Sequence, residues 1–293
     1  MDIKKIFVIG AGAMGAGIAQ TAAVKGFHVI LNDVTMYRVE KAKMGIEKQL
    51  IKNVEKGIIT EDEKNAALER LILCDSYDKV AEADLVIEAI YENIDAKKEI
   101  FKEIDKLKKE NAILASNTSS LSLTSISSVL EKPENFIGMH FFNPVPVMKL
   151  LEIVVGLSTS QETIATALKV GEMLGKETII AKDSPGFIVN RALVVMLNEA
   201  ICMYDEGVGT AEDIDKGMML GCNHPMGPLE LMDMIGIEII LAVMESFHRD
   251  FGDSKYRPSI LLRKMVAAGR FGRKTGRGFY TYDKNGRKIK STK

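Results

Sequence analysis

The chain has 293 residues, which is enough for one large and one small domain. Its hydrophobic content of 46% and charged content of 27% are those of an ordinary globular protein, and its net charge of −1 lacks the basic excess of a nucleic-acid binder. Its three cysteines form no C-x-x-C pair, so they predict neither a disulfide framework nor a metal cluster. No apolar run approaches the roughly 18 residues of a membrane span, and we expect a cytoplasmic protein that binds neither nucleic acid nor membrane.

Short apolar runs rich in branched residues mark the candidate strands, with helical patterns between them. They lie at 5–9, 27–31, 71–74, 85–90, 112–115, 135–139, 151–155 and 178–181. Strands that alternate with helices predict parallel βαβ units. Between the second and third runs, 39–54 has the pattern of a charged amphipathic helix, and Thr60 with Glu63 forms the capping box of another. We expect a helical hairpin here that projects from the sheet.

The pattern changes near residue 183. Met- and Leu-rich helical segments follow at 187–204, 212–220, 229–251 and 260–268, and the glycine-rich basic tail at 270–280 is expected to be a structured loop. The sequence therefore predicts two domains, 1–183 and 184–293. Because so small a helical domain carries so much apolar surface, we expect it to form a homodimer.

A glycine loop directly follows the first strand and opens a helix. The loop consists of Gly10, Ala11, Gly12, Ala13, Met14 and Gly15. Its first glycine permits the tight turn, the second lets backbone approach a pyrophosphate, and the third allows the helix to pack closely on the sheet. The predicted fold class is α/β: a Rossmann-type, mostly parallel sheet with a helical hairpin insertion, followed by an all-α C-terminal domain.

Asp33 stands 18 residues after Gly15, at the end of the second strand. A carboxylate there can accept hydrogen bonds from the adenosine ribose hydroxyls and would repel a 2′-phosphate, which favours NAD over NADP. Arg38 is near enough in sequence to leave NADP possible. A structural glycine turn with a surface aspartate, or an FAD site, are the alternatives for this fingerprint.

One glutamate lies inside an apolar strand. Glu152 is flanked by Leu151 and Ile153, where an ionised carboxylate needs a partner from elsewhere in the fold. His140, twelve residues earlier, is the nearest candidate. An imidazole oriented by a carboxylate is an acid/base device.

Three longer strings carry a resemblance. They are Ser-Asn-Thr-Ser-Ser at 116–120, His-Phe-Phe-Asn-Pro-Val-Pro-Val-Met-Lys-Leu-Leu-Glu at 140–152 and Asp-Ser-Pro-Gly-Phe-Ile-Val-Asn-Arg at 183–191. With the Gly10 loop and the Gly-Phe-Tyr at 278–280, they make nearly the whole chain resemble the L-3-hydroxyacyl-CoA dehydrogenase family.

The resemblance implies a reaction and a role for each of four residues. The family reversibly oxidises an (S)-3-hydroxyacyl-CoA to a 3-oxoacyl-CoA with NAD. By resemblance the substrate is expected to be 3-hydroxybutyryl-CoA, oxidised to acetoacetyl-CoA, although the sequence itself does not fix the length of the acyl chain. By resemblance His140 moves the hydroxyl proton and Glu152 holds its ring. Ser119 is assigned to the substrate oxygen and the nicotinamide, although it could cap a helix starting at 121. Asn190 is assigned to the substrate, although it could bond locally within its helix.

Further positions match family contacts with less physical support. The cofactor contacts would be Glu92, Lys97, Asn143 and Lys274. For Glu92 and Lys97 a solvated helix start is an alternative, and Asn143 could bond its own loop. Lys56 matches a contact to the CoA phosphates on a basic stripe with Lys48 and Lys52, which could equally be a solvated face. Gln49 stands where better-known members have serine, which puts a hydroxyl contact to CoA in doubt.

Two other readings remain open at this point. A dehydrogenase of small free hydroxy acids shares the two-domain architecture but typically places a lysine where this chain has Asn190. A non-catalytic NAD-binding protein on the same scaffold would not need both His140 and Glu152.

Overall fold

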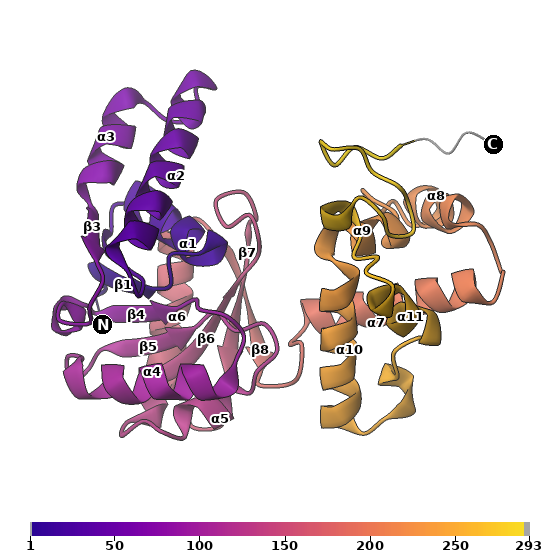
Figure 1. The fold of residues 1–293 in the computed structure, drawn as a ribbon. Coiled ribbons are helices and arrows are strands. Elements are labelled where there is room, and N and C mark those ends of the chain that lie inside the picture. The colour runs from indigo at the N-terminus through magenta and orange to yellow at the C-terminus, as the bar shows by residue number, and fades with distance from the viewer. Residues whose placement is uncertain (1, 290–293) are drawn as a thin grey trace. The chain divides into compact units, whose positions relative to one another are not determined.

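A computed structural model describes residues 2–289. The chain folds into two compact units, 1–184 and 185–293 (Figure 1). Within the described residues no helix is both long and apolar enough to cross a membrane.

The first unit is built on one eight-stranded sheet. Its strands are β1 (Lys5–Ile9), β2 (His28–Asn32), β3 (Leu71–Cys74), β4 (Leu85–Glu88), β5 (Ile113–Ser116), β6 (Phe136–Phe141), β7 (Leu150–Val155) and β8 (Glu177–Lys182). They are arranged in the order β3-β2-β1-β4-β5-β6-β7-β8, and every neighbouring pair is parallel except β6 with β7. The Rossmann-type, mostly parallel sheet is confirmed. The strand order reverses between β1 and β4, which is where such sheets bind ligands.

Helices connect these strands and cover the sheet. They are α1 (Ala13–Val24), α2 (Met36–Glu55), α3 (Glu61–Glu69), α4 (Ile94–Leu107), α5 (Leu123–Ser127) and α6 (Gln161–Met173). Helices α2 and α3 form the expected hairpin and project beyond the sheet (Figure 1). Helix α3 begins with the predicted capping box, in which the Thr60 side chain accepts from the Glu63 backbone N–H and the Glu63 side chain accepts from that of Thr60.

The β6–β7 pair departs from the parallel pattern that strand–helix alternation predicts. Parallel neighbours need a crossover of about a dozen residues or more, and the connection 142–149 is too short to provide one. The two strands therefore run antiparallel, with His140 directly opposite Glu152.

The second unit is helical. It contains α7 (Val189–Asp205), α8 (Ala211–Gly221), α9 (Pro228–Ile235), α10 (Ile237–Phe251) and α11 (Ile260–Ala267) around a core that includes Leu197, Met232, Met244 and Phe247. The single helix expected at 229–251 is wrong, because Gly236 adopts φ +114° and ends α9. The N–H of Ile237 bonds to the carbonyl of Phe271 in the tail. The tail itself is the expected loop, with one short 3₁₀ turn at Arg273–Thr275.

Candidate active site

The His140 and Glu152 side chains meet across β6 and β7. Their Cα atoms are register partners, and the distance from His140 Nδ1 to Glu152 Oε2 is 2.6 Å. Register partners on neighbouring antiparallel strands project from the same face, which is why residues twelve apart in sequence touch. Glu152 is 0% and His140 5% exposed. The buried carboxylate thus has the partner that its apolar neighbours in sequence could not supply.

The glycine loop has the backbone geometry that a pyrophosphate site requires. Gly10 adopts φ +99°, and a Cβ on Gly15 would lie 1.7 Å from the Gly10 carbonyl oxygen. A Cβ on Gly12 would meet nothing within 4 Å, and Gly12 is the N-cap of α1 with no side chain capping that helix end. The N-terminal end of α1 therefore has no side-chain cap and has open space at Gly12, where an anion is favoured by the helix dipole. Ala11, Ala13 and Met14 complete the loop.

Asp33 at the end of β2 is tied to this loop. Its Oδ2 accepts from the Ala11 backbone N–H at 2.8 Å, and its Oδ1 accepts from the Val34 N–H at 2.8 Å and from Arg38 Nη1 at 3.3 Å. The loop and the carboxylate expected at the ribose are thus brought together. In this ion pair the Arg38 side chain is largely exposed, whereas the Asp33 side chain is mostly buried.

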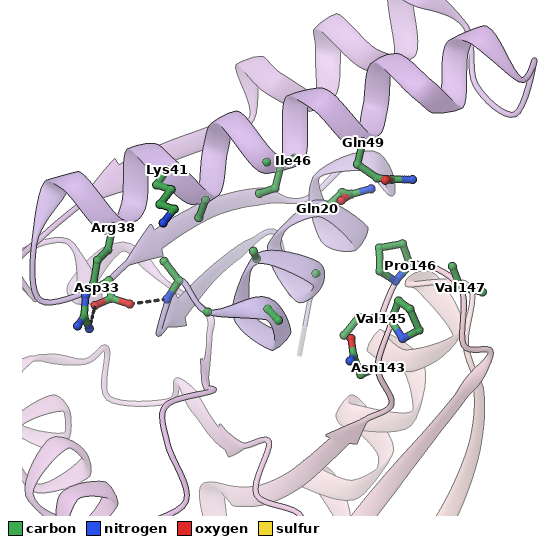
Figure 2. Close-up of a pocket in the computed structure, with 18 residues that line it drawn as sticks. Gln20, Asp33, Arg38, Lys41, Ile46, Gln49, Asn143, Val145, Pro146 and Val147 are labelled. Carbon is green, nitrogen blue, oxygen red and sulfur yellow. Dashed lines mark hydrogen bonds and ion pairs between the residues drawn. The ribbon is translucent and has the colours of Figure 1, made fainter. Parts of the chain in front are cut away.

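A cleft of about 680 Å³ lies between α1, α2 and the β6–β7 connection. Figure 2 shows Asp33 and Arg38 at one end, Lys41, Ile46 and Gln49 along α2, and Asn143 with Val145 to Val147 on the opposite side. A second hollow of about 450 Å³ shares Gly12, Asp33 and Arg38 with it and is also lined by Tyr77, Tyr91 and Ile100. Two spaces therefore flank the glycine loop, and Gln49 and Asn143 belong to the larger one.

Lys176 was not identified from the sequence, yet it holds one wall of the cleft. Its ammonium donates to the carbonyl of Val145 at 2.5 Å and to that of Met148 at 2.8 Å, and the residue is 8% exposed. Val145 in turn packs on α1, since a Cβ on Gly17 would lie 2.9 Å from Val145 Cβ. A lysine before a strand gives no local signal of such a role, because the two carbonyls lie about 30 residues earlier.

Ser119 lies in the segment after β5 and is not a helix cap. Helix α5 begins at Leu123, and its N-cap is Ser122, whose side chain accepts from the Ser125 N–H. The Ser119 backbone N–H instead donates to Glu92 Oε1 at 2.8 Å. The capping alternative for Ser119 is therefore wrong, and the structure brings Ser119 and Glu92 together.

The solvated helix start is wrong for Lys97, whereas the Glu92 side chain keeps partial exposure. Lys97 is 1% exposed, and its ammonium lies 2.6 Å from Glu88 Oε1 and 3.4 Å from Glu92 Oε2. Glu88 was missed from the sequence, although it carries the same signal as Glu152: a glutamate within the apolar run Leu-Val-Ile-Glu-Ala-Ile at 85–90.

The pKa of Glu92 reflects opposing influences. Burial raises the pKa of this carboxyl, but the Lys97 ammonium and hydrogen bonds from Thr118, Ser119 and Ser120 outweigh burial and leave the pKa below its usual range. Glu92 therefore carries its charge at neutral pH.

Three further predicted residues belong to other elements. Lys56 is the exposed C-cap of α2 and is not among the residues lining the 680 Å³ cleft, whereas Gln49 of the same helix is. In the second unit, Asn190 lies in the first turn of α7, and Lys274 pairs with Glu238. Among the described residues, no group of three or more His, Cys, Asp or Glu side chains is placed to hold a metal ion.

Comparisons with known proteins place both units. Residues 5–184 match the family described as "3-hydroxyacyl-CoA dehydrogenase, NAD binding domain", and residues 186–282 match "3-hydroxyacyl-CoA dehydrogenase, C-terminal domain". The chain is 51% identical to a probable 3-hydroxybutyryl-CoA dehydrogenase of Bacillus subtilis (97% of this chain, 99% of the relative). It is 45% identical to the human mitochondrial hydroxyacyl-coenzyme A dehydrogenase (96% and 91%).

The fold comparison agrees. The crystal structure of (S)-3-hydroxybutyryl-CoA dehydrogenase PaaH1 from Ralstonia eutropha superposes with a TM-score of 0.95 at 50% identity, covering 97% of this chain and all of that one.

Proposed function

This chain belongs to the 3-hydroxyacyl-CoA dehydrogenase family, and on that premise we propose that it reversibly oxidises (S)-3-hydroxybutyryl-CoA to acetoacetyl-CoA with NAD. NAD-dependent oxidation of a 3-hydroxyacyl-CoA is the family activity, and the butyryl chain length follows the relatives named for it. The observation that carries the proposal is the buried 2.6 Å contact between His140 and Glu152, because a proton must leave the 3-hydroxyl as hydride leaves C3.

The two side chains divide the proton transfer between them. Glu152 accepts from Nδ1–H and so fixes the ring tautomer, which makes Nε2 the nitrogen that takes the substrate proton during oxidation and returns it during reduction. The Glu152 carboxylate stabilises the imidazolium formed in that step, as the acid beneath a triad histidine does. When bound, NAD supplies the hydride acceptor. General acid/base catalysis of this kind contributes about 10²- to 10⁴-fold.

The cofactor would lie across the carboxyl ends of the strands. The pyrophosphate of NAD would lie at the N-terminus of α1, beside Gly12. The Asp33 carboxylate would accept hydrogen bonds from the adenosine ribose hydroxyls and would repel the 2′-phosphate of NADP. Asn143 and Lys274 would complete the cofactor contacts.

The acyl-CoA would use other residues. We propose Ser119 and Asn190 for the reacting end of the substrate and Lys56 for a CoA phosphate. The exposure of Lys56 at the end of α2 suits an anion, and so does the basic stripe of the same helix.

Loss of NADH absorbance with acetoacetyl-CoA or with free acetoacetate tests the proposal. We expect turnover with the thioester and little with the free acid. Oxidation of NADH by the free acid alone would favour a hydroxy-acid dehydrogenase, and no turnover with either would favour a binding protein on this scaffold.

We also propose that the protein is a cytoplasmic homodimer. Its three cysteines are unpaired, and the second unit exposes Val208, Leu220 and Ile260. Burying such residues against a second copy would remove apolar surface from water. Sedimentation equilibrium should give twice the mass of the chain, and a monomer at micromolar concentration would argue against the dimer.

A further inference from the structure

Glu88 is a fully buried carboxylate with three donors around it. It is 0% exposed and is the last residue of β4, directly opposite Ser116, the last residue of β5. Its Oε2 accepts from Ser116 Oγ at 2.6 Å, and its Oε1 accepts from Lys97 Nζ at 2.6 Å and from the Ile90 backbone N–H at 2.7 Å. Removing a carboxylate from water costs free energy even when it is fully paired, so stability alone does not explain Glu88. Its role follows from the groups that it positions.

What Glu88 holds is the ammonium of Lys97, which stands between two carboxylates. The Nζ atom lies closer to Glu88 than to Glu92, at 2.6 Å against 3.4 Å. Lys97 itself is 1% exposed, so in this arrangement its ammonium does not reach a ligand in solvent. Glu92, by contrast, has a side chain that is 34% exposed.

Glu92 organises the segment that follows β5. Its Oε1 accepts from the Thr118 hydroxyl at 2.6 Å and from the backbone N–H groups of Ser119 at 2.8 Å and Ser120 at 3.1 Å. The buried Glu88–Lys97 ion pair thus lies beside Glu92, and the Glu92 carboxylate positions the backbone around Ser119. In a sheet of this order the dinucleotide crosses from β2 toward β4 and β5, so this segment borders the nicotinamide half.

We propose that Glu88 is a positioning residue for the nicotinamide half of the cofactor. It holds the Lys97 ammonium beside Glu92 Oε2, so that Glu92 Oε1 is left to accept the hydrogen bonds from residues 118–120 and Ser119 keeps its place. Lys97 acts in the same relay. The inference rests on the use of NAD under the proposed function.

The test compares two ligands on one variant. NADH contains the nicotinamide, whereas ADP-ribose has the same adenosine and pyrophosphate without it. For Glu88→Gln, which keeps the shape but removes the charge, we expect the Kd of NADH to rise about tenfold while that of ADP-ribose stays at the wild-type value. Calorimetric titration of the full chain measures both.

Asp84→Asn is the matched control. Asp84 precedes the opposite end of β4 and likewise accepts from a lysine, Lys109, and from backbone N–H groups. Both Kd values should remain at the wild-type level in this variant. Ser116→Ala removes one donor to Glu88 without changing any charge, so it should raise the NADH to ADP-ribose ratio of Kd values in the same direction by a smaller factor.

The outcomes separate the two proposals. A wild-type chain that fails to bind NADH would overturn the proposed function and this inference with it. A wild-type chain that binds NADH, with an unchanged ratio in Glu88→Gln, would overturn the inference alone, and so would equal weakening of both ligands. If Glu88→Gln does not fold, the ratio for Ser116→Ala decides, and an unchanged ratio overturns the inference.

Discussion

Two glutamates in this chain sit at 0% exposure in apolar strands, and each is paired directly across the sheet. Glu152 faces His140 on an antiparallel neighbour, and Glu88 faces Ser116 on a parallel one. A carboxylate that keeps its charge in such surroundings needs donors placed to within a fraction of an ångström. Glu88 is the last residue of β4, at the edge where sheets of this kind bind ligands, whereas Glu152 is the third residue of β7.

His140 can be tested by a substitution that leaves its surroundings in place. We expect His140→Gln to lower kcat by at least about 10²-fold, because glutamine neither takes nor returns the proton, while the NADH Kd changes little. Steady-state kinetics with acetoacetyl-CoA and fluorescence titration of NADH measure the two quantities. His28→Gln, at an exposed histidine that begins β2, is the control. Wild-type turnover in His140→Gln would remove this residue from the chemistry.

A second test concerns the role proposed for Asp33 in the choice between NAD and NADP. Asp33→Ala removes the charge that repels a 2′-phosphate and releases Arg38 from its 3.3 Å contact, so the ratio of kcat/KM for NADPH to that for NADH should rise about tenfold or more. Adding Arg38→Ala should reverse part of that gain. A ratio that does not move in Asp33→Ala would contradict its assignment to the ribose.

At the scale of elements, the β6–β7 connection joins the strand of His140 to the strand of Glu152 and carries Asn143. It has little regular structure of its own, and Lys176 holds it by two of its carbonyl groups. The cleft wall therefore depends on a side chain from the α6–β8 connection, about 30 residues later.

Lys176→Met should loosen this connection. The buried carbonyl of Val145 and the part-buried carbonyl of Met148 would lose their donor. A buried group left unsatisfied costs about 1–3 kcal/mol and a part-buried one less, so we expect the free energy of unfolding to fall by about 2 kcal/mol. The KM for acetoacetyl-CoA should also rise, since the loop lines the 680 Å³ cleft. Urea unfolding followed by circular dichroism and steady-state kinetics provide the readouts. Lys149→Met, at an exposed lysine of the same connection, should change neither quantity.

The elements themselves were largely predictable from local pattern. All eight strand positions are right to within a few residues, because short runs of branched residues between turns have few alternatives. The antiparallel β6–β7 pair could have been read from the short 142–149 connection. The break at Gly236 could not, because a single glycine is tolerated within many helices, and the bond from the next residue to the tail, some 35 residues later, leaves no mark on the local pattern.

Site residues were predictable where the family resemblance or an unusual local pattern, such as a charged residue within an apolar run, marked them. His140, Glu152 and the Gly10 loop are examples. Glu88 offered the same oddity and was passed over. Lys97 and Lys176 were beyond local reasoning, because their burial depends on carbonyls and carboxylates that only the fold brings near them.

At the scale of the whole molecule, the chain contains two units with separate cores, so their stabilities can respond differently to the same change of solvent. The second unit has a distinctive polar interior. Buried Asp215 accepts from the Tyr280 hydroxyl at 2.8 Å, and buried Asp233 accepts from the Tyr282 hydroxyl at 2.9 Å. These bonds tie the tail to α8 and α9. Burial and the facing carboxylates raise the pKa of both tyrosines well above the usual range.

This arrangement predicts alkaline instability of the second unit. In the unfolded state the tyrosine hydroxyl has a pKa of about 10, whereas in the folded unit it keeps its proton to higher pH. Above about pH 10 the folded state therefore binds more protons than the unfolded state does. The stabilisation is complete below that pH and declines as pH rises, by about 1.4 kcal/mol per pH unit for each tyrosine. A fluorophore on Cys222, the exposed cysteine of this unit, should report a falling urea midpoint between roughly pH 10 and 11.

Substitution of one tyrosine separates this effect from general alkaline damage. Tyr280→Phe should lower the midpoint at pH 8, because Asp215 loses a donor, but it should also make the alkaline decline shallower by about 1.4 kcal/mol per pH unit. Tyr204→Phe is the control, since that tyrosine of the same unit is 38% exposed. Equal alkaline slopes in wild type and Tyr280→Phe would mean that the raised tyrosine pKa does not govern the stability of this unit, whatever the midpoint at pH 8.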